Sequence, residues 1–161
     1  PPMKYKYIAL GEAAVFLMWG PLMVEGAYYV QMQTLSMKAL LVSIPFGVLV
    51  ALTIFANNIR DIDHDSSRSI CTLAIRLGLR RGIHAYLLLM VLAYVSMFFI
   101  TLSGVLTPWA FLVFLSLPLA ASLLRQMKQG VPPDADARTA KLDTAFGVLL
   151  VAALIIQGLT G

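Results

Sequence analysis

Long apolar stretches separated by shorter polar segments dominate the hydropathy pattern of the chain. Five of these stretches are nearly free of charge, and each matches the roughly 20 residues that a helix needs to cross a bilayer. Lipid leaves helices and closed barrels as the spanning structures, and near-continuous apolarity favours helices. The pattern therefore predicts an all-α integral membrane protein with five transmembrane helices, over about residues 10–30, 39–56, 83–103, 109–124 and 142–159.

The composition supports a membrane environment for these helices. Of the 161 residues, 60% are hydrophobic and only 12% are charged, and the mean hydropathy is +0.84. A water-soluble domain of this length would carry more charge on its surface. We therefore expect one transmembrane helical domain over residues 1–161, with membrane lipid covering much of its surface.

The basic residues indicate how the helices are oriented. The formal net charge is +4, but these residues sit in short loops rather than on a soluble basic face, so we expect no nucleic-acid partner. Threading the spans in order places eleven of the twelve Lys and Arg residues on one side and Lys38 alone on the other. The positive-inside rule makes the richer side cytoplasmic and puts Gly161 on the opposite side. The eleven are Lys4, Lys6, Arg60, Arg68, Arg76, Arg80, Arg81, Arg125, Lys128, Arg138 and Lys141.

The loops on the two sides differ in their content. The outer loops, residues 31–37 and 104–108, have too few polar groups to build a site. The first inner loop, residues 57–82, holds three aspartates, five arginines and a histidine, so we expect it to be functional. The second inner loop, residues 125–141, contains Pro132-Pro133 followed by Asp134 and Asp136, which predicts a turn with solvated charges and a mainly connecting role.

Three oxygen-bearing side chains follow the second predicted span at a regular interval. Asn57, Asp61 and Asp65 are spaced i, i+4, i+8, so they form one polar stripe if the helix continues, whereas Asp63 falls off it. Mg²⁺ is typically held by one or two carboxylates together with waters and the phosphate oxygens of a substrate. The stripe therefore predicts a metal and diphosphate site, with these three residues as its metal-binding and catalytic groups.

Arginines surround the stripe. Arg60, Arg68 and Arg76 suit bidentate contact with phosphate oxygens, which would help the metal to neutralise a diphosphate. The alternative is a solvated loop that simply obeys the positive-inside rule. His64 is either a base beside the metal or a solvated side chain, and His84 is a weaker candidate.

Two glutamates lie within the first predicted span, Glu12 and Glu25. Burying an ionised carboxylate at the bilayer centre costs at least ~2.5 kcal/mol, so each should face the bundle interior or lie near a helix end. Glu12 is near the cytoplasmic end, where it either orients a substrate or pairs with a lysine. Glu25 lies closer to the outer face, and its role stays open.

The string NNIRDIDHDSSRSICTLAIRLG, from Asn57 to Gly78, resembles the second aspartate-rich motif of the UbiA superfamily of intramembrane prenyltransferases. It is most similar to the branch that prenylates 1,4-dihydroxy-2-naphthoate, in which paired Asn residues precede Arg-Asp and a Thr-Leu-Ala-x-Arg-Leu-Gly segment follows. Residues 10–31, including Leu10-Gly11-Glu12 and Tyr28-Tyr29-Val30-Gln31, resemble the fifth helix of the same branch.

The resemblance implies a position within a larger fold. The family bundle has nine helices with two aspartate-rich motifs facing one another, so this chain corresponds to the C-terminal five helices. The first motif, Asn-Asp-x-x-x-Asp, has no counterpart, nor has the upstream helix with its Tyr and Lys, unless Lys4 or Lys6 substitutes. The start at Pro1 and the odd number of spans likewise lead us to expect a cut polypeptide, a split protein or one half of a larger bundle.

The resemblance also implies an activity: Mg²⁺-dependent transfer of a polyprenyl group from polyprenyl diphosphate to an aromatic acceptor. In this branch the acceptor is 1,4-dihydroxy-2-naphthoate, the pathway is menaquinone biosynthesis, and the simplest setting is a bacterial inner membrane with the active face in the cytoplasm. On this view Asn57, Asp61 and Asp65 hold the metal and diphosphate. The substrate-binding residues are Arg60, Arg68, Asn58 and Glu12.

Other readings remain at this point. The chain by itself is either catalytic or a non-catalytic half-bundle that needs an N-terminal partner, and homogentisate or 4-hydroxybenzoate are alternative acceptors. A CDP-alcohol phosphotransferase is disfavoured because its Asp-Gly-x-x-Ala-Arg pattern is absent. A transporter is disfavoured because the acidic cluster lies at the membrane surface rather than at the midplane.

Overall fold

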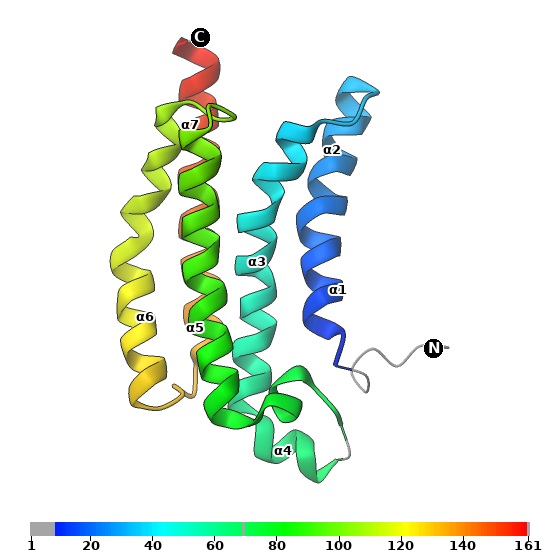
Figure 1. Ribbon diagram of the computed structural model, residues 1–161, viewed down its shortest axis with the longest axis vertical. Coiled ribbons are helices and arrows are strands. Elements are labelled where there is room, and N and C mark those ends of the chain that lie inside the picture. The colour runs from blue at the N-terminus through cyan, green and yellow to red at the C-terminus, as the bar shows by residue number, and fades with distance from the viewer. Residues whose placement is uncertain (1–8, 69, 161) are drawn as a thin grey trace.

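The protein is a bundle of long antiparallel helices (Figure 1). The computed structural model describes residues 9–68 and 70–160, which form helices and no strand. Five helical stretches in this part of the chain are long and apolar enough to cross a membrane, which confirms the predicted all-α membrane fold. They are Gly11–Met32, Met37–Arg60, Leu73–Leu102, Pro108–Gln129 and Ala135–Thr160. Their elements are α1 (Gly11–Leu17), η2 (Met18–Leu22), α2 (Met23–Met32), α3 (Met37–Arg60), α5 (Leu73–Leu102), η3 (Pro108–Ser116), α6 (Leu117–Gln129) and α7 (Ala135–Thr160), with the short α4 (Ile62–Ser67) between α3 and α5.

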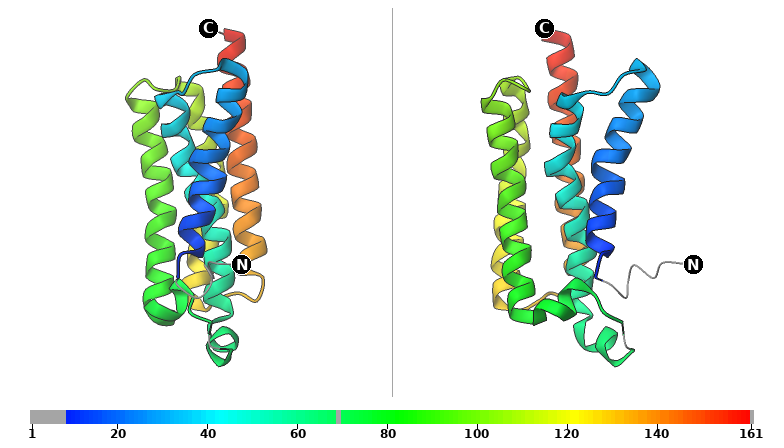
Figure 2. Two further views of the ribbon diagram at one scale, coloured as in Figure 1. Left: turned by 90° about the vertical axis from the view of Figure 1, so that its right-hand side faces the viewer. Right: turned by 45° about the vertical axis from the view of Figure 1, so that its right-hand side comes forward.

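The charged segments gather at one end of the bundle. Residues 57–82 and 125–141 lie at the same end as the start of α1, and we call this the charged end (Figures 1 and 2). The short connections 33–36 and 103–107 and the end of α7 lie at the opposite end. Lys4, Lys6 and Gly161, which the orientation argument also used, are outside the described residues.

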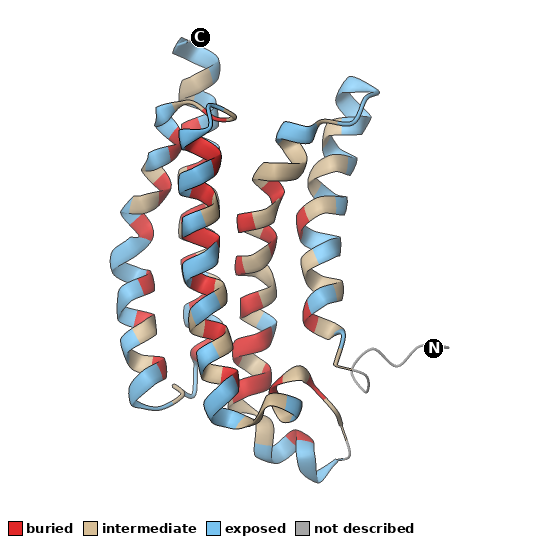
Figure 3. Ribbon diagram, viewed as in Figure 1, coloured by how far each residue is buried: buried red, intermediate tan, exposed pale blue. Residues whose placement is uncertain are grey.

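Helix α3 lies at the centre of the packing and contacts α1, α5 and α7. Its buried side chains join those of α5, η3 and α7 in one apolar core (Figure 3). Two buried hydroxyl pairs add hydrogen bonds between helices, Tyr86 with Thr139 at 2.8 Å and Tyr94 with Ser116 at 2.6 Å. Such pairs satisfy polar groups that lipid cannot. The largest fully buried side chains include Tyr86, Phe55, Phe146, Leu49, Leu52 and Ile59.

The first span stands at the edge of the bundle and crosses α3 at a pair of glycines (Figure 2). A Cβ on Gly47 would lie only 2.8 Å from the Cα of Gly20, so the two backbones are in direct contact. Small residues permit this close approach of membrane helices. The contact falls within the π-helical turn η2, which contains Pro21, a residue with no N–H to donate to the helix ladder.

Two helices begin earlier at the charged end than the apolar spans indicated. Helix α5 starts at Leu73 rather than near residue 83, and α7 starts at Ala135 rather than near residue 142. Thr72 caps α5, because its side-chain oxygen accepts a hydrogen bond from the Ile75 N–H at 3.3 Å. The predicted loop over residues 57–82 is therefore corrected: most of it is helical, as α4 and the first turns of α5.

Helix α5 changes direction at Gly78, where φ is 72° and ψ is 162°. This region of backbone space is open essentially to glycine alone. The bend lets the first turn of α5 run across the charged end before the helix turns along the bundle (Figure 1). The glycine that closes the Thr-Leu-Ala-x-Arg-Leu-Gly segment thus has a backbone role.

Candidate active site

The acidic motif follows α3 across a break in the helix. Helix α3 ends at Arg60, and Asp61, with φ of −97° and ψ of 15°, separates it from α4. The single polar stripe was conditional on the helix continuing through Asp65, and the break at Asp61 shows that this condition is not met. The i to i−4 hydrogen bonds nevertheless persist through the break, from the Asp61 N–H to the Asn57 carbonyl at 3.0 Å and from the Asp65 N–H to the Asp61 carbonyl at 2.8 Å. Asn57 and Asp61 stay on neighbouring turns, while Asp65 belongs to α4.

Arg60 binds the motif itself. Its Nε donates to Oδ1 of Asp61 at 2.8 Å, and its Nη2 donates to Oδ2 of Asp61 at 3.0 Å and to Oδ1 of Asn57 at 2.7 Å. Its Nη1 donates to Asp136 and to the Pro133 carbonyl. A guanidinium has five N–H donors, so this set of bonds engages all of them. Arg60 thus holds Asn57 and Asp61 side by side with their oxygens fixed.

Asp136 is a member of this cluster that the sequence did not indicate. We expected it in a solvated turn, but it lies in the first turn of α7 with its side chain only 33% exposed, and it forms an ion pair with Arg60. The partners are 76 residues apart in the chain. No local pattern reports such a contact, because the adjoining Pro132-Pro133 turn brings α7 back toward α3 only in the folded bundle.

Glu12 and Asn58 form a second polar contact, on another face of α3. Nδ2 of Asn58 donates to Oε1 of Glu12 at 2.8 Å, and both residues are buried. Glu12 therefore faces the bundle interior, as expected, and pairs with an amide rather than with a lysine within the described residues. Successive residues of a helix point about 100° apart, so Asn57 and Asn58 point in different directions. In the folded protein Asn58 points toward Glu12 of α1.

A polar pocket joins the two contacts. It has a volume of about 340 Å³ and lies at the charged end between the start of α1, the end of α3 and the start of α5. Glu12, Asn57, Asn58 and Thr72 supply its polar groups. Its remaining lining residues are Ala9, Gly11 and Ile54.

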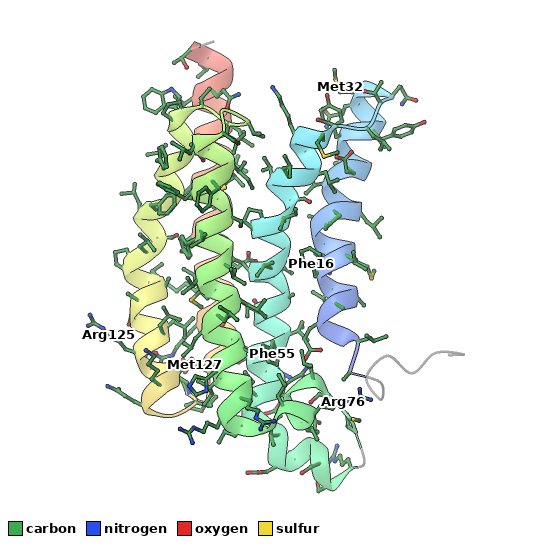
Figure 4. All side chains as sticks on the ribbon, in the orientation of Figure 1. Phe16, Met32, Phe55, Arg76, Arg125 and Met127 are labelled. Carbon is green, nitrogen blue, oxygen red and sulfur yellow. The ribbon has the colours of Figure 1, made fainter. Side chains whose placement is uncertain are left out.

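An apolar pocket of about 230 Å³ continues from Glu12 along α3, away from the charged end. Glu12 is the one polar residue among those that line it, and the same glutamate lines the polar pocket. Phe16 of α1 and Phe55 of α3 are labelled in Figure 4. The full lining is Glu12, Ala13, Phe16, Val48, Ala51, Leu52, Phe55, Leu73 and Leu89.

The remaining motif residues differ in exposure. Asp65 is buried, whereas Asp63, His64 and Arg68 are exposed. Nδ1 of His64 lies 3.9 Å from Oδ1 of Asp65, and the histidine side chain is 61% exposed. Asp65 is therefore shielded from solvent, whereas Arg68 is exposed at the surface of the charged end.

Three other candidates lie apart from the pockets. Nε of Arg76 donates to Sγ of Cys71 at 3.4 Å, and Nδ1 of His84 is 2.7 Å from the Arg80 carbonyl. At the opposite end of the bundle, Oε2 of Glu25 accepts a hydrogen bond from the Ser36 N–H at 3.1 Å. Glu25 therefore connects α2 to the start of α3 and takes no part in the polar pocket.

The donors at the motif suit a hard cation but do not enclose one. Among residues 9–68 and 70–160, no group of three or more His, Cys, Asp or Glu side chains converges to hold a metal ion. Asn57, Asp61 and Asp65 offer only oxygen, which Mg²⁺ prefers. A carboxylate has about four lone-pair sites, so the two bonds that Asp61 accepts from Arg60 do not by themselves prevent it from binding a cation. Among the described residues, these oxygen donors suit Mg²⁺ chemically and would need further ligands to hold the ion.

Comparison with known proteins gives a consistent picture. The UbiA prenyltransferase family matches residues 1–155. A 1,4-dihydroxy-2-naphthoate octaprenyltransferase of Bacillus subtilis is 31% identical over 160 residues, which cover 97% of this chain and 51% of that protein. The UbiA prenyltransferase domain-containing protein 1 is 33% identical over 152 residues in both Homo sapiens and Gallus gallus, covering 94% of this chain and 44% and 45% of those proteins. The chain spans about half the length of the curated relatives it matches.

Proposed function

This chain belongs to the UbiA prenyltransferase family, and from that premise we propose that it forms part of the active site for transfer of a polyprenyl group from its diphosphate to an aromatic acceptor. We propose 1,4-dihydroxy-2-naphthoate as the acceptor, Mg²⁺ as the cofactor and menaquinone biosynthesis as the pathway. The relative from Bacillus subtilis carries this acceptor in its name. Because this chain matches only about half of that protein, we assign to it the part of the site that its own residues build.

One observation carries the proposal: Glu12 lines both the polar pocket and the apolar pocket. A polyprenyl diphosphate has a highly charged head and a long apolar tail, so its site must be divided in the same way. The polar pocket lies beside Asn57 and Asn58 at the charged end, and the apolar pocket extends from it between α1, α3 and α5. The boundary between the pockets is where the reacting carbon and the aromatic ring would meet.

The proposed reaction breaks the bond between the allylic carbon and the diphosphate oxygen, and its electron pair leaves with the diphosphate. An electron pair of the aromatic ring forms the new carbon–carbon bond at the ring carbon that bears the carboxylate. The carboxylate departs as CO₂, and the electron pair of that broken bond restores the aromatic ring. The products are the prenylated hydroquinone, diphosphate and CO₂.

The chain's residues take distinct parts in this reaction. Asn57, Asp61 and Asp65 would hold Mg²⁺, which when bound neutralises the charge that develops on the departing diphosphate. Arg60 keeps Asn57 and Asp61 in place, because its N–H donors are directed at them. Arg68, exposed at the end of α4, is a candidate contact for the diphosphate.

Glu12 and Asn58 are suited to orient the acceptor. The Asn58 amide fixes one carboxylate oxygen of Glu12, and the other oxygen can accept a hydrogen bond from a ring hydroxyl. Such positioning contributes to catalysis because it holds the ring carbon near the allylic carbon.

The proposal extends to the surroundings of the site. The charged end faces the cytoplasm, since it carries the basic loops, and the membrane is a bacterial inner membrane. An N-terminal half, corresponding to the remaining length of the relatives, completes the diphosphate site opposite the Asn57 motif.

The test is a transfer assay in membranes that contain the intact protein, with Mg²⁺ and a radiolabelled polyprenyl diphosphate. Parallel reactions receive 1,4-dihydroxy-2-naphthoate, homogentisate or 4-hydroxybenzoate, and both prenylated product and released diphosphate are measured. We expect product with 1,4-dihydroxy-2-naphthoate only. Product with another acceptor alone would replace the proposed acceptor, and folded protein that is inactive with all three would overturn prenyl transfer.

A second set of reactions tests whether residues 1–161 need an N-terminal half for activity. Residues 1–161 are expressed alone and together with a matching N-terminal half from the same enzyme. We expect turnover only when both are present, because this chain supplies one motif of the two that the family uses. Turnover by residues 1–161 alone would show that the second motif suffices.

A further inference from the structure

A pair of grooves outside the active site lies on the outer surface of α6 and α7 at the charged end. One groove, of about 150 Å³, runs between α6 and α7 and is lined by Leu119, Ser122, Leu123, Gln126, Arg138, Lys141 and Leu142. The other, of about 410 Å³, lies across α6 and includes Pro118, Ser122, Arg125 and Gln126. Ser122 and Gln126 line both grooves, so we call these two residues the ridge between the grooves.

The ridge is a fixed polar structure. Nε2 of Gln126 donates to Oγ of Ser122 at 3.1 Å, and Oε1 of Gln126 accepts from Nη1 of Arg138 at 2.6 Å. Nε of Arg138 donates to Asp134 at 2.7 Å, and this bond holds the pKa of the Asp134 carboxyl below its usual range. The chain of bonds leaves the Ser122 hydroxyl hydrogen directed away from Gln126 and free to donate to a ligand.

Cations flank this ridge on both sides. Arg125 lines one groove and Lys141 the other, and both are exposed (Figure 4 labels Arg125). Neither forms a hydrogen bond or ion pair with any other residue in the described ranges 9–68 and 70–160. No acidic residue lines either groove. The surface at the ridge is therefore positively charged, with two cations that have no side-chain partner among the residues that the structure describes.

Apolar residues also line both grooves, and Pro118 and Leu119 lie about one turn of α6 further from the charged end than Ser122. Leu119, Leu123 and Leu142 are the apolar lining residues of one groove, and Pro118 and Ala121 are those of the other. These residues belong to the helical stretches Pro108–Gln129 and Ala135–Thr160, which are long and apolar enough to cross a membrane. A ligand that fills both depressions must therefore carry negative charge at one end and apolar chains at the other.

We propose that this ridge and its two grooves bind an anionic phospholipid of the leaflet at the charged end. The phosphate lies over Ser122 and Gln126 between Arg125 and Lys141, and one acyl chain follows each groove. Basic pockets at the cytoplasmic ends of membrane helices suit such headgroups, and here the two apolar grooves add a place for each chain. The site is separate from the prenyl-transfer pockets and does not depend on the proposed function.

The test compares lipids of equal chain length by native mass spectrometry of the intact protein in detergent. Phosphatidylglycerol and phosphatidylcholine are titrated separately, and glycerol phosphate serves as the headgroup without chains. We expect retained phosphatidylglycerol at concentrations where phosphatidylcholine is lost. Near a surface each basic residue contributes roughly a fivefold gain in affinity for anionic lipid, so Arg125→Gln with Lys141→Gln should weaken phosphatidylglycerol binding by roughly 25-fold.

A matched control removes the same charge at the same end of the bundle. Arg80 and Arg81 are exposed on α5 and line neither groove, so Arg80→Gln with Arg81→Gln should leave the lipid preference unchanged. Because Arg125 and Lys141 have no partner among the described residues, the double variant should fold, and Lys141→Gln alone provides a milder test.

Three results would overturn the proposal. The first is equal retention of phosphatidylglycerol and phosphatidylcholine, which would mean that charge does not select the lipid. The second is an equal loss in both double variants, which would reduce the effect to the overall positive charge of this end. The third is equally tight binding of glycerol phosphate, which would make the ridge a site for free phosphate esters.

Discussion

The first span and its neighbour α3 are both apolar helices of membrane-spanning length, yet they are held in different ways. The most apolar window of the first span has a mean hydropathy of 1.3 and only 6% of it is buried, against 2.5 and 39% for α3. Helix α3 contacts α1, α5 and α7, whereas the first span packs mainly against α3 (Figures 2 and 3). Hydropathy identifies both as membrane helices but does not show which of them packs against several other helices.

Three specific contacts position the first span. They are the hydrogen bond from Asn58 to Glu12 at the charged end, the crossing of Gly20 and Gly47, and the hydrogen bond from the Ser36 N–H to Glu25 at the opposite end. The site residues of α3 sit on a core helix, but Glu12 sits on a helix whose position depends on these contacts. Changes to the site residues should therefore affect the chemistry directly, and changes to the helix crossing should act through the position of the first span.

The largest expected effect is on the α3 side, from Asp61→Asn. The change keeps the shape but removes the charge that binds the cation and pairs with Arg60. Removing one preorganised electrostatic group typically lowers turnover about 100- to 1000-fold, and we expect a loss of this order in the transfer assay. Asp63→Asn is the control, because Asp63 is exposed and off the stripe. Near-normal turnover of Asp61→Asn would remove Asp61 from the metal site.

The next effect is on the attachment of the first span, from Gly47→Ala. The new Cβ would lie 2.8 Å from the Cα of Gly20 and 3.1 Å from the Phe16 carbonyl oxygen, so the two backbones must separate. Overpacking of this kind costs about 1 to 3 kcal/mol, which should appear as a lower free energy of unfolding in detergent. Gly26→Ala, in α2 of the first span and with no atom within 4 Å of the added Cβ, should not destabilise the protein. Equal stability of the two variants would show that the crossing is loose.

A smaller effect tests how α7 supports the α3 motif, with Asp136→Asn. Arg60 keeps its bonds to Asn57 and Asp61 but loses an ionic partner that is partly exposed. A loss of about 1 kcal/mol, discounted for solvent screening, should raise the apparent Mg²⁺ or diphosphate concentration for half-maximal rate roughly fivefold. Asp134→Asn removes the neighbouring pair with Arg138 and should leave this value unchanged. An equal rise in the half-maximal concentration for both variants would mean that the effect comes from the loop around residues 132–136 and not from the ion pair with Arg60.

The smallest effect is expected from Glu12→Gln. The amide oxygen still accepts from Asn58, so the contact survives as a neutral hydrogen bond, which is weaker than a charged one by about 1 kcal/mol. We expect KM for the aromatic acceptor to rise roughly two- to fivefold with little change in kcat. Glu25→Gln makes the same change in the same span at the far end, and should not alter KM. A changed kcat with constant KM would place Glu12 in the chemical step instead.

The sequence was informative about the helices because a membrane span is defined by the length of an apolar run, which is a local property. It was less informative about their ends. The stretch from Leu73 to Arg81 is helical on both sides of Gly78 although it carries three arginines, since charges at the charged end remain in contact with water. Hydropathy therefore reports the part of a helix that lipid covers and not the whole helix.

For the site, the local spacing placed Asn57 and Asp61 on neighbouring turns but did not reveal the break at Asp61 or the bonds from Arg60. The contacts from Asn58 to Glu12 and from Arg60 to Asp136 join residues 46 and 76 positions apart. These contacts depend on how helices pack, and no periodic pattern encodes them. The metal ligands and the acceptor stay predictions until the assays are done.

The bend at Gly78 has a consequence for interpreting natural variants of this protein. Thr72 lines the polar pocket and Leu73 lines the apolar one, so the first turn of α5 forms a wall shared by both, and its direction is set by one backbone angle. A side chain at Gly78 would meet no atom within 4 Å, although the positive φ of 72° disfavours any residue with a Cβ. A prediction based on steric contacts alone would therefore treat a substitution at Gly78 as harmless. A prediction that includes backbone conformation would treat it as damaging to the wall of both pockets.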